Sequence, residues 1–293
     1  MTYKIVPVCP ALTWICTSIA VAATVTGYGC HKTAKQHTGQ ERASRAAGVT
    51  VTVVYDNYQH DERLKTAWGF SCLVEGLEKT ILFDTGGNAG VLLSNMRKLD
   101  IDPGQVDIVV ISHVHGDHAG GLKGFLRETS NITVYLPTSF PNSMKRMVTD
   151  SGARLKEVSG PAQVCRGAAS TGEIGRGIRE QSLLVHTPVG VVLVTGCAHP
   201  GIVNIAQHAR RQLGTEVHMA MGGFHLGGAT TDRIEGIIED MKELGVRAVA
   251  PSHCSGDKAR RLFEQSYGAT YEPAGVGWTK RFQAQKSDAD APE

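Results

Sequence analysis

Residues 107–122, DIVVISHVHGDHAGGL, decide how the rest of the chain is organised. The stretch begins with an apolar run at residues 107–111, which predicts a buried strand, and a polar turn with two glycines follows it. Imidazole nitrogen and carboxylate oxygen are ligands for zinc and similar divalent metals, so the turn predicts a metal site. Its ligand-type residues are His113, His115, Asp117 and His118.

The spacing within this turn suggests how the ligands are arranged. In an extended run, residues two apart point the same way, so we expect His113, His115 and Asp117 to face one point. His118 would then diverge from Asp117, which suits a second metal beside the first. The alternative is a polar loop with chance histidines. Four ligand-type residues directly after an apolar strand favour the metal site.

The same arrangement of apolar run, small-residue turn and histidine occurs again later in the chain. Each histidine taken singly is more often a surface or hydrogen-bonded residue than a ligand. Because strand ends converge at one rim of an α/β sheet, the repetition predicts that these imidazoles gather there. The predicted strands are residues 190–195, 216–221 and 246–250, and the histidines are His199, His225 and His253.

Two cysteines lie next to these histidines. Cys197 and Cys254 could bind metal as thiolates, but buried cysteine is commonly a small hydrophobe, and we expect that role here. Three other histidines, His60, His186 and His218, stand outside the repeated pattern, and we interpret them as bystanders.

Composition and element order indicate a soluble α/β domain. Apolar residues make up 41% of the chain and charged residues 20%, and the net charge of +2 gives no strong field for nucleic acid. Predicted strands and helices alternate, which favours α/β over all-β. Residues 138–180 carry no clear pattern. They are interpreted either as an insert on the substrate side or as a variable surface loop.

The first thirty residues differ from the rest. Residues 5–29 carry no charge, Lys4 precedes them, and residues 20–22 fit an A-x-A cleavage site, so a secretory signal is predicted. An uncleaved anchor and a lipoprotein cysteine at Cys30 are the alternatives, and all three imply an exported protein, periplasmic or membrane-anchored. The predicted parts are a leader at 1–30, a polar linker at 31–48, a hydrolase-like domain at 49–285 and a disordered tail at 286–293.

The metal turn, residues 113–118, resembles the HxHxDH motif of the metallo-β-lactamase superfamily. Four more blocks occur in the family's order, and three of them resemble the branch of dihydropterin ribofuranosylaminobenzene phosphate synthase-like proteins. The four blocks are LFDTG at 82–86, VTGCAHPGIVNI at 194–205, MGGFHLGG at 221–228 and PSHCSG at 251–256.

The resemblance implies an αββα sandwich with one or two divalent metals at its edge, zinc first and manganese or iron as alternatives. It implies that Asp84 supports the metal loop through hydrogen bonds without binding metal. His225 stands where many members have a bridging aspartate, and it binds either a metal or the substrate. The implied first site is His113, His115 and His199, and the implied second site is Asp117, His118 and His253.

The predicted function is metal-dependent hydrolysis of an ester-type bond, namely a phosphoester, a lactone or another carboxylic ester. A divalent metal lowers the pKa of bound water and makes hydroxide available, while Asp117 orients the nucleophile or accepts its proton. The expected partner is a small-molecule substrate, without nucleic acid, and with membrane contact only through the N-terminal segment. There are three alternatives: a pterin-phosphate synthase-like enzyme, a metal-dependent oxidoreductase and a non-enzymatic binding module. The export signal disfavours the first. His115 disfavours the second, because diiron members of the family place glutamate at that position.

Overall fold

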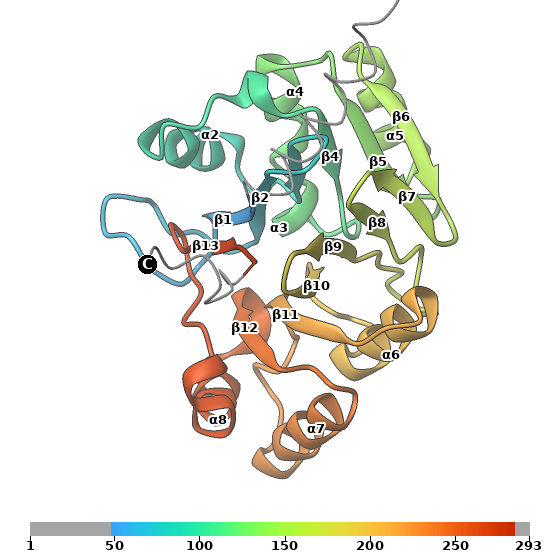
Figure 1. Ribbon diagram of the computed structural model, residues 1–293. Helices are drawn as coiled ribbons and strands as arrows, with labels where there is room; N and C mark the ends of the chain where they lie inside the picture. The colour runs from blue at the N-terminus through green and yellow to red at the C-terminus, as the bar shows by residue number, and fades with distance from the viewer. Residues whose placement is uncertain (1–47, 285–293) are drawn as a thin grey trace, which may run out of the picture. The chain divides into compact units, whose positions relative to one another are not determined.

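The computed structural model describes residues 48–284, which form two mixed β-sheets with helices on both outer faces (Figure 1). The first sheet has seven strands in the order β13-β1-β2-β3-β4-β5-β6, and the second has six in the order β12-β11-β10-β9-β8-β7. Strands β3 to β6 run parallel to one another, as do β10 to β12. The predicted αββα sandwich is confirmed.

The elements have the following bounds. The first sheet contains β1 (Val49–Tyr55), β2 (Ser71–Glu75), β3 (Ile81–Phe83), β4 (Ile108–Val110), β5 (Thr133–Pro137), β6 (Arg154–Val158) and β13 (Thr279–Phe282). The second contains β7 (Ala162–Cys165), β8 (Ala168–Ser170), β9 (Leu183–Thr187), β10 (Gly190–Thr195), β11 (Val217–Gly223) and β12 (Ala248–Ser252). The α-helices are α2 (Ala89–Lys98), α3 (Gly116–Ala119), α4 (Leu122–Glu128), α5 (Asn142–Asp150), α6 (Ile202–Leu213), α7 (Thr231–Glu243) and α8 (Asp257–Tyr267), and the short 3₁₀ helices are η1 (Pro103–Gln105), η2 (His253–Ser255) and η3 (Gly268–Thr270).

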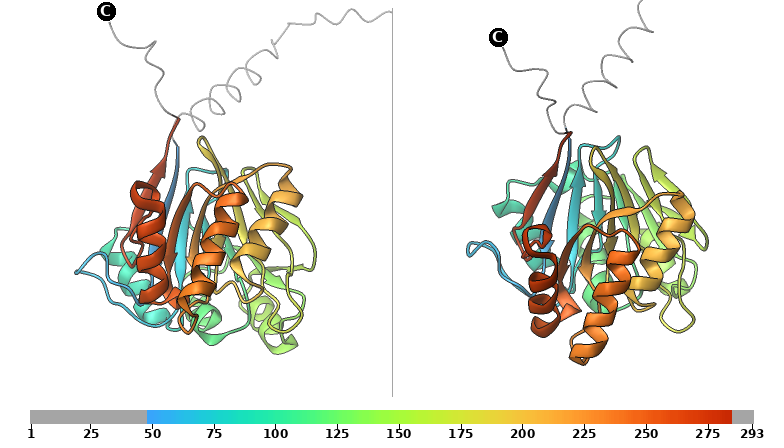
Figure 2. Two further views of the ribbon diagram at one scale, coloured as in Figure 1. Left: turned by 90° about the horizontal axis from the view of Figure 1, so that it is seen from below. Right: turned by 60° about the horizontal axis from the view of Figure 1, so that its bottom comes forward.

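Three apolar clusters hold the four layers together, and strand alternation explains them. In β2, Cys72 and Val74 point into the cluster between the sheets, whereas Leu73 points out to the cluster beneath α2 and α4. In β10, Val194 belongs to the inner cluster and Leu193 to the outer one beneath α6, α7 and α8. Both faces of the central strands are therefore buried, as parallel strands require, and Figure 2 shows helices outside the paired sheets.

Two sequence interpretations are corrected here. The metal turn is not an extended run, because residues 116–119 form the helix α3. Residues 138–180 are neither an insert nor a plain surface loop. They supply α5, the edge strand β6 of the first sheet, and the edge strand β7 of the second sheet with its neighbour β8. Edge strands such as β6, with sequence RLKEV, are charged and half exposed, so they lack a strong apolar signal.

The predicted leader, linker and tail lie outside the described residues, apart from Gly48 at the end of the linker, and they remain predictions. Across residues 48–284, no helix has both the length and the apolar character needed to cross a membrane.

Candidate metal centre

Ligand-type side chains from both sheets meet at the rim where several strands end. His113 and His115 follow β4, and α3 comes directly after them. The loops after β10, β11 and β12 bring the remaining side chains from the second sheet. Parallel strands end on the same side, so residues more than 100 positions apart in sequence are brought together. The gathered ligand-type residues are His113, His115, Asp117, His118, Cys197, His199, His225, His253 and Cys254.

The first cluster consists of His113, His115 and His199, whose ligand atoms all lie within 4.8 Å of one another. His113 Nε2 is 3.1 Å from His115 Nδ1. The hydroxyl of Ser112 is 2.9 Å from His113 Nδ1, which leaves Nε2 of that ring facing the cluster. His199 Nε2 is buried and has no hydrogen-bond partner among the described residues.

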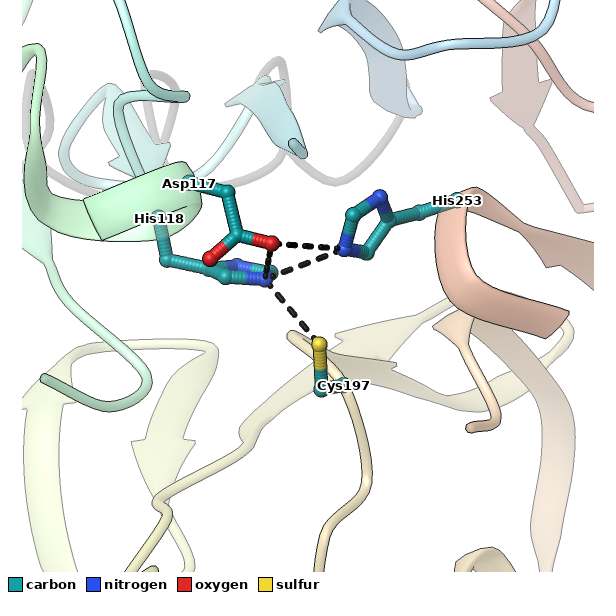
Figure 3. A group of neighbouring side chains, drawn as sticks. All are labelled: Asp117, His118, Cys197 and His253. Atoms are coloured by element: carbon teal, nitrogen blue, oxygen red, sulfur yellow. Dashed lines mark hydrogen bonds and ion pairs between the residues drawn. The ribbon is translucent and has the colours of Figure 1, made fainter. Parts of the chain in front are cut away.

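The second cluster contains Asp117, His118, Cys197 and His253 (Figure 3). Asp117 Oδ2 lies 3.3 Å from His253 Nε2 and 3.7 Å from His118 Nε2. The expectation that Asp117 faces the same point as His113 and His115, with His118 diverging, is wrong. Because α3 is helical, Asp117 and His118 turn together toward the second cluster, which is the grouping that the family resemblance implied.

Hydrogen bonds to the far nitrogens orient the rings of the second cluster. Asp84 Oδ2 accepts from Ser112 Oγ at 2.7 Å and lies 2.7 Å from His118 Nδ1, while Oδ1 accepts from the Ser112 N–H at 2.7 Å. Asn57 Oδ1 is 2.9 Å from His253 Nδ1. Nε2 of each imidazole is thus left for the cluster. Asp84 itself belongs to none of the ligand clusters among the described residues.

Replacing Asp84 with asparagine is therefore expected to weaken metal binding by about 10–100-fold without removing a ligand. The amide would present an N–H₂ group to one of the groups that now donate to the carboxylate. Competition against a chromophoric chelator measures the affinity. Asp102→Asn, at an exposed cap of η1, is the matched control and should bind like the parent chain. Equal affinities in both variants would contradict the supporting role of Asp84.

Sequence reasoning missed Glu180, which is fully buried beside the β10 loop. Its Oε1 accepts the backbone N–H groups of Gly196, Cys197 and Ala198 at 2.9–3.1 Å, and its Oε2 accepts that of His199 at 2.9 Å. One carboxylate thus holds the whole loop that carries two ligand-type residues. Its place in the unpatterned segment before β9 gave no signal, because its partners are backbone groups that spacing does not reveal.

The site's loops hold strained backbone conformations. Outside glycine, only five described residues have positive φ, and four of them are Asp84, Ala198, His225 and His253. The left-handed region is unfavourable for residues with a Cβ, particularly alanine, and such strain concentrates at functional sites. The loop after β10 also needs Gly196, because a Cβ there would lie 2.1 Å from Ser112 Oγ.

Burial and crowding favour the neutral form of two imidazoles of the first cluster, those of His113 and His199. Burial lowers the pKa of His113, and the nearby His118 and His199 lower it further. Burial, together with His225 and His115, lowers the pKa of His199 to about 4. The neutral imidazole is the form that binds metal. Burial raises the pKa of Asp117, but the hydrogen bond with His253 and the charges of His118 and His253 outweigh it and hold that pKa below its usual range.

His225 does not join either histidine cluster. It is exposed, its ring centroid is 4.5 Å from that of His199, and it forms a third group with Cys197 and Cys254. Both cysteines are buried and free, and both lie beside ligand-type groups. Both roles expected for His225, as a metal ligand or as a substrate contact, stay predictions.

Residues 69–253 match the model of the metallo-beta-lactamase superfamily. The chain belongs to this superfamily. A 7,8-dihydropterin-6-methyl-4-(beta-D-ribofuranosyl)-aminobenzene-5'-phosphate synthase from Methanocaldococcus jannaschii is 29% identical over 263 residues, covering 73% of this chain and 90% of that protein. A solved structure described as a metal-dependent hydrolase of the beta-lactamase superfamily is 28% identical, with a TM-score of 0.69, covering 80% of this chain and 99% of that one. The short form of human tRNase Z, 13% identical with a TM-score of 0.55, covers 79% of this chain and 98% of that one and shares the fold.

The donor sets of this metallo-β-lactamase domain fit divalent metals. In a tetrahedral zinc site, ligand nitrogens lie about 3.3 Å apart. His113 Nε2 and His115 Nδ1 are 3.1 Å apart, and His118 Nε2 and His253 Nε2 are 3.2 Å apart. The buried, unpartnered Nε2 of His199 is the atom that a metal would satisfy.

Proposed function

We propose that the protein is a metal-dependent hydrolase of an ester-type bond, either a phosphoester or a lactone or other carboxylic ester. The observation that carries the proposal is the pair of adjacent ligand clusters, joined by the 4.3 Å approach of the His113 and His118 rings, with a carboxylate in one of them. Two ions held so close are suited to binding both the attacking and the leaving oxygen of a displacement.

The chain's own residues would contribute in distinct ways. Divalent metal supplies Lewis-acid chemistry, activating water and polarising the scissile bond. His113, His115 and His199 would hold one ion, and Asp117, His118 and His253 the other. Asp117 is 22% exposed at its side chain and so can reach water. A carboxylate whose pKa is held low is a weak base, so its main part is to orient the attacking water by accepting its hydrogen bond.

A small-molecule substrate with an apolar portion suits the rim. Trp68 is 61% exposed, yet its ring centroid lies 4.8 Å from that of His253. Val114, between the first two ligand histidines, is 37% exposed. Large exposed apolar side chains beside a polar site provide surface on which a substrate is held and oriented.

A substrate panel on the purified chain tests the proposal. The panel contains aryl phosphodiesters and monoesters, lactones and carboxylic esters, with zinc, manganese or iron supplied in turn. We expect hydrolysis of at least one class, loss of that activity after dialysis against a strong chelator, and its return when the metal is restored. Turnover that persists at full rate in metal-free protein would refute a metal-dependent hydrolase.

The second candidate is a synthase like the M. jannaschii relative, which the 29% identity over 73% of this chain favours. Its name describes a dihydropterin joined through a 6-methyl group to a ribofuranosyl-aminobenzene phosphate. The discriminating assay supplies a dihydropterin with a leaving group on its 6-methyl carbon, together with the ribofuranosyl-aminobenzene phosphate whose amine displaces that group. Product formation there, together with no hydrolysis anywhere in the panel, would replace the hydrolase proposal with this one.

A further inference from the structure

Cys197 is the one member of the second cluster that the proposed function does not use. Its Sγ lies 3.1 Å from His118 Nε2, among the ligand atoms of Asp117, His118 and His253 (Figure 3). The cysteine is 3% exposed, so its sulfur is aimed at three ligand-type groups and not at solvent. A cysteine that was only a filler of apolar space would face carbon atoms, as Cys72 does in the core between the sheets.

We propose that Cys197 is the fourth protein ligand of the second metal ion, bound as the thiolate. This inference rests on the proposed function only in requiring that a metal binds there. The set of one oxygen, two nitrogens and one sulfur then gives the ion four protein ligands, and a reacting oxygen would add as a fifth, as zinc allows in catalytic sites. No aspartate is needed to bridge the two ions, which accounts for the lack of one in the blocks that follow His199.

The distances suit that arrangement. With Zn–N near 2.1 Å and Zn–S near 2.3 Å, a tetrahedral site places a sulfur and a nitrogen about 3.6 Å apart. Cys197 Sγ is 3.1 Å from His118 Nε2, and the separations among Asp117, His118 and His253 run from 3.2 to 3.7 Å. All ligand atoms of the cluster lie within 4.8 Å of one another, so shifts of about 1 Å or less at each side chain bring them to the spacing of a tetrahedral site.

The loop that carries Cys197 is built to hold the sulfur in place. Glu180 fixes the backbone N–H of Cys197 at 3.0 Å and those of its neighbours. The adjacent Ala198 is held at a φ of 58°. These contacts set the direction of the Cys197 side chain before any metal arrives, which lowers the cost of binding.

Cys254 is the competing thiol. It forms a group with Cys197 and His225, and its Sγ is 3.7 Å from the carbonyl oxygen of Cys197. It is absent from the cluster of Asp117, His118 and His253. The geometry therefore assigns the metal-bound sulfur to Cys197, and Cys254 provides a matched control with the same substitution.

A thiolate in the second site also makes a prediction about metal choice. Soft sulfur ligands favour zinc, whereas oxygen ligands suit manganese. Cys197→Ser should lower zinc affinity by at least about 100-fold, more than typical losses from outer-shell changes, while manganese affinity falls much less. The ratio of zinc to manganese affinity, measured by competition, is thus expected to drop in Cys197→Ser and to hold in Cys254→Ser.

Cobalt(II) substitution of the full chain gives a direct readout that does not depend on turnover. A thiolate bound to cobalt produces an intense near-ultraviolet charge-transfer band. We expect the band in the parent chain and in Cys254→Ser, and its loss in Cys197→Ser. Because the serine variant could fold poorly, X-ray absorption of the zinc-loaded parent and Cys254→Ser chains provides a second test, with a sulfur scatterer expected at about 2.3 Å in both.

The outcomes separate this inference from the proposed function. Cobalt bound at both sites without a thiolate band or sulfur scatterer would overturn the role of Cys197 and leave the hydrolase proposal standing. A band that vanishes in Cys254→Ser and persists in Cys197→Ser would identify Cys254 as the metal-bound thiolate, and it would also overturn the role proposed for Cys197. Failure of the parent chain to bind any cobalt or zinc would overturn both proposals together.

Discussion

Alanine at both His113 and His115 should abolish hydrolysis and remove at least one bound ion per chain. The two rings supply two of the three nitrogens of the first cluster, and His199 alone cannot hold a metal there. Metal ions contribute several kcal/mol to transition-state stabilisation, so we expect kcat/KM to fall by about 10³-fold or more. Metal content by elemental analysis and turnover on the best panel substrate measure the two effects.

A matched double variant separates loss of ligands from loss of histidine in general. His60 and His186 are exposed and lie outside every ligand cluster among residues 48–284. Replacing both His60 and His186 with alanine should leave the metal content and the turnover rate as in the parent chain. Retention of full activity by the His113 and His115 double variant would show that the ions, if any, bind elsewhere.

The sequence was sufficient to predict the residues that gather at this rim, because the apolar runs and the histidines after them are local signals. The run predicted at residues 190–195 is strand β10 with the same bounds. The pairing of His118 with Asp117 could not be predicted from spacing, because a one-turn helix and an extended turn have similar polar sequences. Family resemblance grouped them correctly where the local geometric argument did not.

Residues that act through the backbone or from unpatterned segments escaped prediction. Glu180 contacts four backbone N–H groups, and neither end of such a contact has a sequence signature. Helix α8 and strand β13 were also missed. The strand pairs with β1 at a sheet edge, where exposed lysine and arginine hide the alternating pattern. Cys197 was visible in the sequence, but its contact with His118 depends on two sheets meeting.

Glu180→Ala should have the largest effect on stability of any single change at the site. The substitution leaves four buried N–H groups without their acceptor, and each unsatisfied group costs about 1–3 kcal/mol before water or rearrangement compensates. Even with substantial compensation, we expect a loss of about 3 kcal/mol in the free energy of unfolding. For a domain of this size, that corresponds to a decrease in Tm of roughly 6–12 °C.

Glu180→Gln tests whether the carboxylate positions the ligands as well as stabilising the loop. Glutamine keeps one acceptor oxygen but must turn its N–H₂ group toward an N–H donor, most simply that of His199. We expect a smaller decrease in Tm than for alanine, together with weaker metal binding at a temperature where the variant is folded. Glu128→Gln, at the exposed end of α4, is the control and should change neither quantity. If Glu180→Gln lowered Tm but bound metal as tightly as the parent chain, Glu180 would have a structural role only. Such a result would mean that the loop still presents His199 and Cys197 correctly, so metal binding would not need the carboxylate.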